Sequence, residues 1–112
     1  MTTPLAYDVA DDELELFQQE VNEHLRAIES GILQLGEGAS AETLHAVFRA
    51  AHTLKAVAGT VGHQPMVELT HTMETLFGAM QEGRLSPTPA LTDDLLAAVD
   101  GLRTLRDEVL GR

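Results

Sequence analysis

The sequence predicts an all-α fold, an antiparallel up-down bundle of four helices. Apolar residues recur at steps of three and four along most of the chain, and no stretch shows the alternation of a strand. Glycine and proline separate the periodic stretches by short connections, which is typical of neighbouring antiparallel helices. A chain of 112 residues, 44% of them apolar, is long enough for one core. We therefore expect one domain over residues 9–110, preceded by a disordered or short N-terminal segment, residues 1–8.

The first helix is expected from about Val9 to Leu35, with Asp8 or Asp11 as its N-cap. The run Gly36-Glu37-Gly38 ends it, because glycine is the usual residue after a helix. Its buried stripe has helical spacing and consists of Leu14, Phe17, Val21, Leu25, Ile28, Ile32 and Leu35.

The second helix is expected to begin after Ser40, a favourable cap, and to end at Gly62. Its apolar positions fall on one stripe, so that one face of the helix turns to the core. These positions are Leu44, Val47, Phe48, Ala51, Leu54, Ala58 and Val61.

Pro65 opens the third helix, because proline is tolerated in a first turn where its missing N–H has no partner to lose. Gly83 closes this helix. The predicted buried face consists of Met66, Leu69, Met73, Leu76, Phe77 and Met80. We interpret Met66, Met73 and Met80 as core residues and not as a groove for a ligand.

The fourth helix is expected after the loop Ser86-Pro87-Thr88-Pro89, with Thr92 as its N-cap. Asp93 and Asp94 would then lie at the positive end of the helix dipole. The positions expected to face inward are Leu95, Leu96, Val99, Leu102, Leu105 and Val109.

The charge of the chain indicates which classes of partner it can bind. A formal net charge of −11 repels nucleic-acid phosphates and anionic lipid surfaces, so proteins are the expected partners. The absence of cysteine excludes disulfides and thiol chemistry and fits a reducing compartment. No apolar run approaches the roughly 20 residues of a membrane span, and the first residues do not resemble a signal peptide. We therefore expect a cytoplasmic location.

Helical geometry brings His52 and Glu74 together. With about 100° of rotation per residue, His52 lies at the flank of the second helix's apolar stripe, and Glu74 lies at the same offset on the third helix. Each is about 15 Å from the connecting turn at the usual helical rise. Because antiparallel neighbours with equal offsets turn these flanks toward each other, we predict a hydrogen bond between His52 and Glu74 at the solvent edge.

Such a pair makes the imidazole an oriented nucleophile. A carboxylate that accepts from Nδ1–H leaves the lone pair of Nε2 available and stabilises positive charge on the ring after attack. Lys55, one turn further on, can offer its ammonium to an anion on that nitrogen, and Ala56 and Gly59 keep the surface low for an approaching protein.

The surroundings of His52 also favour an anion. Between Glu42 and Glu68 the acidic chain has no acidic residue but has Arg49 and Lys55. A doubly charged phosphoryl group requires this kind of local balance, and Arg49 is a candidate contact for a docked partner.

These residues resemble a known family. The run from Ala50 to Gly62, Ala-Ala-His-Thr-Leu-Lys-Ala-Val-Ala-Gly-Thr-Val-Gly, follows Val47-Phe48-Arg49 and precedes the run Thr70-His71-Thr72-Met73-Glu74. Together they resemble the histidine phosphotransfer domain at the N-terminus of chemotaxis-type sensor histidine kinases, and the resemblance extends from Phe17 through the fourth helix.

The resemblance implies a function and roles for individual residues. It implies that His52 receives phosphate from ATP through a histidine kinase catalytic domain, on the same polypeptide or a separate one. A response-regulator receiver domain would then take the group onto an aspartate. It further implies that Glu74 orients His52, that Lys55 assists transfer and that His71 belongs to the supporting hydrogen-bond group.

The sequence has no glycine-rich nucleotide loop and no carboxylate cluster for magnesium. We therefore expect no cofactor in this domain and place ATP and Mg²⁺ on its partners.

The sequence departs from the family pattern in two places. The family usually has glycine directly after the lysine, where this chain has Ala56 followed by the bulkier Val57. A fifth helix, usual in the chemotaxis kinases, has no counterpart before Arg112. Both a piece of a longer kinase and a stand-alone carrier agree with this pattern.

Two alternatives compete with the carrier hypothesis. A helical docking module that binds a receiver without being phosphorylated would use the same surface. A metal-binding bundle is suggested by the pairs Glu42/His45 and Glu68/His71, whose spacing matches di-iron bundles, although all four are expected on the faces opposite the apolar stripes. The remaining histidines, His24, His45 and His63, are expected at the surface.

Overall fold

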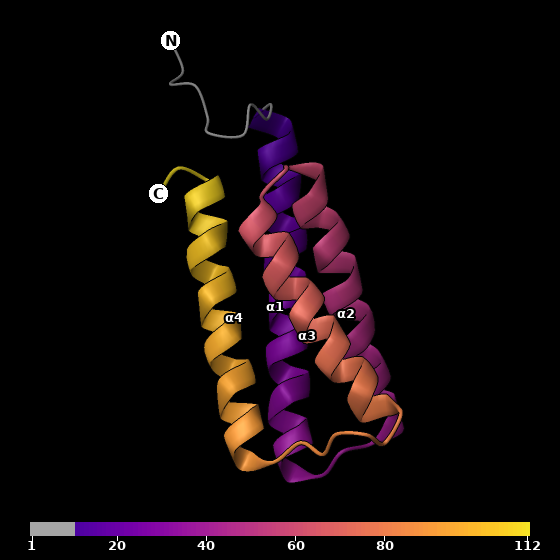
Figure 1. Ribbon diagram of the computed structural model, residues 1–112. Coiled ribbons are helices and arrows are strands. Elements are labelled where there is room, and N and C mark those ends of the chain that lie inside the picture. Colours follow the sequence, from indigo (N-terminus) through magenta and orange to yellow (C-terminus); the bar gives the residue numbers. More distant parts are fainter. Residues whose placement is uncertain (1–10) are drawn as a thin grey trace.

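The computed structural model describes residues 11–112 and confirms the four-helix, antiparallel fold. The helices are α1 (Asp11–Glu37), α2 (Ala41–Thr60), α3 (Gln64–Gln81) and α4 (Pro89–Val109). They run alternately down and up (Figure 1). Both α2 and α4 pack against α1, and both also pack against α3.

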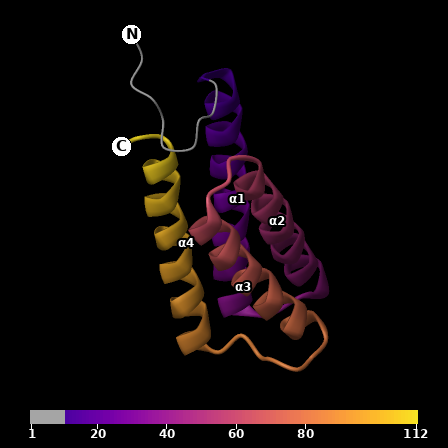
Figure 2. The same ribbon diagram turned by 45° about the horizontal axis from the view of Figure 1, so that its top comes forward.

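The connections differ in length. Tight turns join α1 to α2 and α2 to α3, whereas the link from α3 to α4 crosses the lower end of the bundle (Figure 2). The predicted start of the first helix at Val9 and its proposed cap Asp8 lie outside the described residues. Asp11, the alternative cap, is already helical and lies in the first turn of α1.

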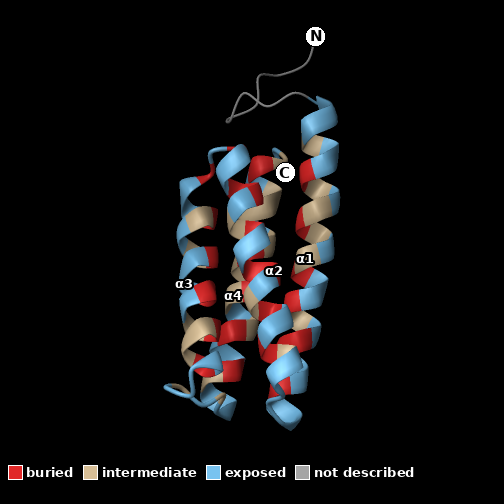
Figure 3. Ribbon diagram, turned by 90° about the vertical axis from the view of Figure 1, so that its right-hand side faces the viewer, coloured by how far each residue is buried: buried red, intermediate tan, exposed pale blue. Residues whose placement is uncertain are grey.

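The core is formed by the inward faces of all four helices (Figure 3). The predicted stripes of α1 and α2 are buried apart from Leu14 and Phe48, which are half-buried against the core. Of the positions predicted to face inward in α3 and α4, four are half-buried and the others are buried. The half-buried ones are Leu69, Leu76, Leu96 and Leu105. The prediction for Met66, Met73 and Met80 is confirmed, since all three are buried in the core.

Close packing of α1 on α2 depends on Gly31. A Cβ atom at this position would lie 2.1 Å from Cγ1 of Val47, which is fully buried. Only a residue without a side chain therefore fits, and the backbone of α1 can approach α2 closely. This contact fixes one side of α2, while α3 packs against another.

The boundaries of α2 agree with the prediction. The Ser40 hydroxyl accepts a hydrogen bond from the Thr43 N–H, which caps the first turn. At the other end Gly62 has a φ of +72°, and the His63 N–H donates to the Ala58 carbonyl across the turn. Glycine is favoured there because the left-handed backbone carries little steric cost without a side chain.

The predicted start of α4 is wrong. Thr88, not Thr92, is the N-cap, and its side chain accepts from the Leu91 N–H with Pro89 in the first turn. Thr92 is buried inside the helix and donates its hydroxyl to the carbonyls of Thr88 and Pro89. Because the helix begins earlier, Asp93 and Asp94 lie beyond its first turn and do not face the dipole at its end.

Candidate functional site

His52 lies at the flank of α2, as predicted. Its neighbours Ala51 and Leu54 are fully buried, whereas 63% of the His52 side chain is exposed. The buried neighbours follow from the helical period of about 100° per residue, which turns Ala51 and Leu54 toward the core and leaves His52 at its flank. The imidazole is thus held on a rigid helix and remains accessible to another molecule.

The predicted hydrogen bond between His52 and Glu74 is present. The Nδ1–H of His52 donates to Oε2 of Glu74 on α3, across the antiparallel α2/α3 pair. Only 11% of the Glu74 side chain is exposed, so the carboxylate lies beneath the ring at the edge of the core. This bond assigns the proton to Nδ1 and leaves Nε2 as the outer nitrogen with a lone pair.

Lys55 binds the other oxygen of the same carboxylate. Its Nζ lies 2.6 Å from Oε1 of Glu74, and 28% of the lysine side chain is exposed. The sequence predicted a lysine free to meet an anion on His52 and did not predict this ion pair. Glu74 therefore joins the two groups, one through each oxygen.

The Glu74 carboxylate is held in its charged form. Burial alone would raise its pKa, but hydrogen bonds from Lys55 and His52 outweigh burial and leave the pKa below its ordinary value of 4.5. At neutral pH the carboxylate is thus ionised. It can stabilise positive charge on the His52 ring without itself taking up a proton.

A groove opens beside His52 along the contact of α2 and α3. Its volume is about 520 Å³, and polar or charged residues make up most of its rim, although apolar atoms form most of the lining surface. The residues that line it are Phe48, His52, Lys55, Glu74, Thr75, Gly78, Ala79, Glu82 and Arg84. The helical period predicts Phe48 in the core stripe and gives no signal for Gly78, Ala79 or the Glu82–Arg84 ion pair, whose closest atoms are 2.7 Å apart.

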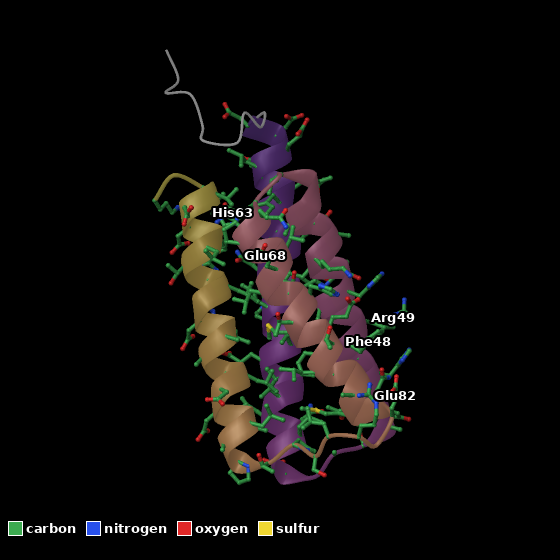
Figure 4. The ribbon with its side chains drawn as sticks, viewed as in Figure 1. Phe48, Arg49, His63, Glu68 and Glu82 are labelled. Atoms are coloured by element: carbon green, nitrogen blue, oxygen red, sulfur yellow. The ribbon has the colours of Figure 1, made fainter. Side chains whose placement is uncertain are left out.

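The predicted docking residues are at the surface. Arg49 extends outward from α2 (Figure 4), and Ala56 and Gly59 are exposed, with open space around Gly59. Val57, the residue expected to affect docking by its bulk, is buried between α2 and α1. Its side chain therefore does not project toward an approaching protein.

His71 is exposed on α3, one turn before Glu74. In the described part of the chain its side chain makes no hydrogen bond to His52, Glu74 or Lys55. The supporting role that the resemblance implies for His71 stays a prediction.

The residues of the metal hypothesis point outward. Glu42, His45, Glu68 and His71 are all exposed, as expected from their positions opposite the apolar stripes. Among residues 11–112 no three histidine or acidic side chains are grouped in a way that could hold a metal ion.

The prediction of a surface position for His63 is wrong. Its side chain is fully buried and caps α3, because Nδ1 accepts a hydrogen bond from the Met66 N–H. Nε2 lies 3.4 Å from Oε1 of Glu108 on α4. His24 is half-buried and His45 is exposed.

The family is established by comparison with known proteins. The model of the Hpt domain family matches residues 12–105, which is most of the chain. The chain therefore belongs to the Hpt family of phosphotransfer domains. This match reaches from the start of α1 into the last part of α4 and contains the His52–Glu74–Lys55 cluster.

Within the family the chain is similar to domains of chemotaxis proteins. It is 33% identical over 97 residues to the chemotaxis protein CheA of Listeria monocytogenes and 38% identical over 92 residues to CheA of Rhizobium meliloti. These matches cover 86% and 81% of this chain but only 16% and 12% of the relatives, so the chain spans a small part of their length.

A solved structure extends the similarity to three dimensions. The CheA phosphotransferase domain from Thermotoga maritima superposes with a TM-score of 0.82 at 31% sequence identity. The match covers 88% of this chain and 95% of that domain. The chain is thus similar in sequence and in fold to a phosphotransferase domain over almost its whole length.

Proposed function

We propose that this domain is a phosphoryl carrier in chemotaxis-type two-component signalling and that His52 is the residue that carries the group. The family and its relatives support the carrier function at the level of the domain. The observation that supports His52 is its geometry: an exposed imidazole on a rigid helix, whose Nδ1 is bound to Glu74, so that Nε2 is the nitrogen left for chemistry.

The first transfer uses Nε2 as the nucleophile. Its lone pair attacks the γ-phosphorus of ATP, the bond to the bridging oxygen breaks, and ADP leaves with the electron pair. The ring becomes positively charged while Nδ1 keeps its proton, and the Glu74 carboxylate stabilises this charge. A kinase catalytic domain, on the same polypeptide or a separate one, would present the ATP.

The second transfer reverses the role of His52. A carboxylate oxygen of an aspartate in a response-regulator receiver attacks the phosphorus, the N–P bond breaks, and its electrons return to Nε2. Glu74 keeps the ring in one tautomer through both steps, so that Nε2 is a nucleophile in the first and a leaving group in the second.

Lys55 adds a positive charge to the same site. Its ammonium binds the same Glu74 carboxylate as His52, and a positive charge near the ring would offset the negative charge of a phosphoryl group. We propose that Lys55 stabilises this group during transfer and that Arg49, Ala56 and Gly59 contact the docked partner. His71 is the remaining candidate for a supporting role.

We expect ATP and Mg²⁺ to be bound by the partner domains and not by this one, since the sequence has no glycine-rich nucleotide loop. We also propose a cytoplasmic location, where ATP is available. None of the helices within residues 11–112 is long and apolar enough to cross a membrane. Nucleic acids and lipid surfaces are not expected partners, because the net charge of −11 repels both.

The experiment is incubation with ATP, Mg²⁺ and a chemotaxis-class kinase core, followed by mapping of the labelled residue and a chase into receivers. We expect label on His52 that is labile in acid and stable in alkali, and none on the His52→Gln variant. Label that is stable in acid and labile in alkali would contradict the assignment. A wild-type domain that binds a receiver but never labels would support the docking-module alternative.

A further inference from the structure

The His52 ring has a second contact, with Phe48. The two residues are one helical turn apart on α2, and their rings are nearly parallel, with an interplanar angle of 11° and centroids 6.5 Å apart. This is an offset stacked arrangement, which aromatic rings prefer over a direct sandwich. The His52 side chain is 63% exposed, and within residues 11–112 Glu74 and Phe48 are two contacts that limit movement of its ring.

Phe48 itself packs against α3. Gly78 lies against its ring, and a Cβ atom at Gly78 would be 3.4 Å from Cε2 of Phe48. The absence of a side chain at Gly78 therefore leaves room for the aromatic ring between the two helices. In Figure 4, Phe48 lies beside the lower half of α3, the half that leads to Glu82.

With the Glu74 hydrogen bond alone, the imidazole ring could still tilt. It fixes the position of Nδ1, but hydrogen bonds to carbonyl-type oxygens accept a broad range of directions. The ring can tilt about this contact, and a tilt moves Nε2, the atom farthest from it. A parallel ring beside the imidazole opposes that tilt.

We propose that Phe48 is a positioning residue for phosphoryl transfer, which sets the direction of His52 Nε2, and that Gly78 makes its position possible. The proposal rests on the proposed function of His52 as the nucleophile. Phe48 does not touch the reacting atoms and acts only through the imidazole. Its effect is on orientation, since small misplacements of a reacting atom lower the rate of transfer.

The test uses potassium phosphoramidate as a small phosphodonor, so that no partner protein is needed. Nε2 of His52 attacks the phosphorus, the P–N bond of the donor breaks, and ammonia leaves. Removing the ring in Phe48→Leu is expected to slow labelling about fivefold, whereas Phe48→Tyr keeps the ring and is expected to stay within about twofold of wild type.

Val47→Ala is the matched control. Val47 is the preceding residue on α2 and is fully buried against α1, so this variant loses packing without touching His52. It should lower the unfolding temperature and label at the wild-type rate. Equal slowing by Val47→Ala and Phe48→Leu would overturn the proposal, since the rate would then report loss of stability.

Gly78 provides a second pair of variants. A methyl group at the Gly78→Ala position makes an ordinary contact with Phe48, so this variant should label normally. The larger side chain of Gly78→Leu needs the space of the Phe48 ring and should slow labelling as Phe48→Leu does. Normal labelling by Gly78→Leu in a folded domain would contradict the role assigned to Gly78.

A spectroscopic readout separates this proposal from the proposed function. In ¹⁵N NMR spectra of the unphosphorylated domain, we expect the Nδ1-protonated tautomer of His52 in wild type and Phe48→Tyr and a changed nitrogen shift in Phe48→Leu. Unchanged shifts and rates in Phe48→Leu would overturn the positioning role. Absence of label on wild-type His52 would instead contradict the proposed function.

Discussion

His52 and His63 are two histidines of one domain that the fold uses in opposite ways. Each ring reaches a glutamate on another helix, Glu74 on α3 and Glu108 on α4. His63 is fully buried at the upper end of the bundle (Figure 4), and its Nδ1 accepts the capping N–H of Met66. His52 is mostly exposed, and in the described part of the chain no residue binds its Nε2.

The difference shows what makes a histidine available for chemistry. A glutamate partner is common to both residues and so does not distinguish them. The distinction lies in which nitrogen is used by the fold. At His63 the Nδ1 lone pair serves the backbone of α3, whereas at His52 the fold uses only the Nδ1 proton and leaves the other lone pair exposed.

The largest expected effect is on labelling by kinase and ATP. His52→Gln should show no label, because glutamine has no nucleophilic nitrogen. His63→Gln, measured well below its unfolding temperature, should label at nearly the wild-type rate. Quantitative mapping of the label by mass spectrometry checks both. Persistent label in His52→Gln, or loss of label in folded His63→Gln, would contradict the assignment of His52 as the phosphorylated residue and His63 as a structural one.

The next effect concerns the two glutamates. Glu74→Gln should slow labelling about 10- to 100-fold, the cost known for removing carboxylates that orient metal-binding histidines. Its amide can still accept from Nδ1–H but cannot stabilise positive charge on the ring. Glu108→Gln is the matched control and should label normally. Initial rates at saturating kinase measure the difference, and equal rates for the two variants would refute the role of Glu74.

A smaller effect is expected on the stability of the domain. Here substitution of His63, and not of His52, should have the larger effect. His63→Ala removes the N-cap of α3 and should lower the free energy of unfolding by about 1–2 kcal/mol. His63→Asn should recover part of this loss, because asparagine is a favourable cap. Urea denaturation at neutral pH measures these values. If His52→Ala destabilised the domain as much as His63→Ala, the division between a structural and an exposed histidine would not hold.

The smallest effect is a dependence of stability on acid. Since Lys55 and His52 outweigh burial and lower the Glu74 pKa, the folded state favours the carboxylate. Its contribution is fully present above the ordinary pKa of 4.5 and is lost as the pH falls through the lowered value. Wild type should therefore lose more stability than Glu74→Gln on acidification below about pH 5. Parallel curves for the two proteins in urea denaturation would contradict this.

The sequence predicted the elements that depend on helical period alone. The His52–Glu74 contact follows from rotation per residue and from equal distances to a tight turn, and both quantities are regular in helices. The ion pair of Lys55 with Glu74 was missed because a lysine side chain has many rotamers and its direction is not set by its position on the helix. Stacking of Phe48 on His52 has a signal in the sequence, a spacing of four, which also fits a core position.

Two errors arose at helix ends. His63 was missed as a cap because histidine is not among the favoured residues, and only the structure shows its Nδ1 at the Met66 N–H. The start of α4 had a usable signal in Thr88-Pro89, a capping residue followed by proline in the first turn. The two prolines nearby favoured a loop, and the local pattern alone did not decide between the two.

The most direct test is ³¹P and ¹⁵N NMR of the domain after phosphorylation by kinase and ATP. We expect the phosphoryl group to be bonded to Nε2 of His52, with the proton retained on Nδ1 beside Glu74. A phosphoryl group on Nδ1 of His52, on His63 or on a carboxylate would contradict it.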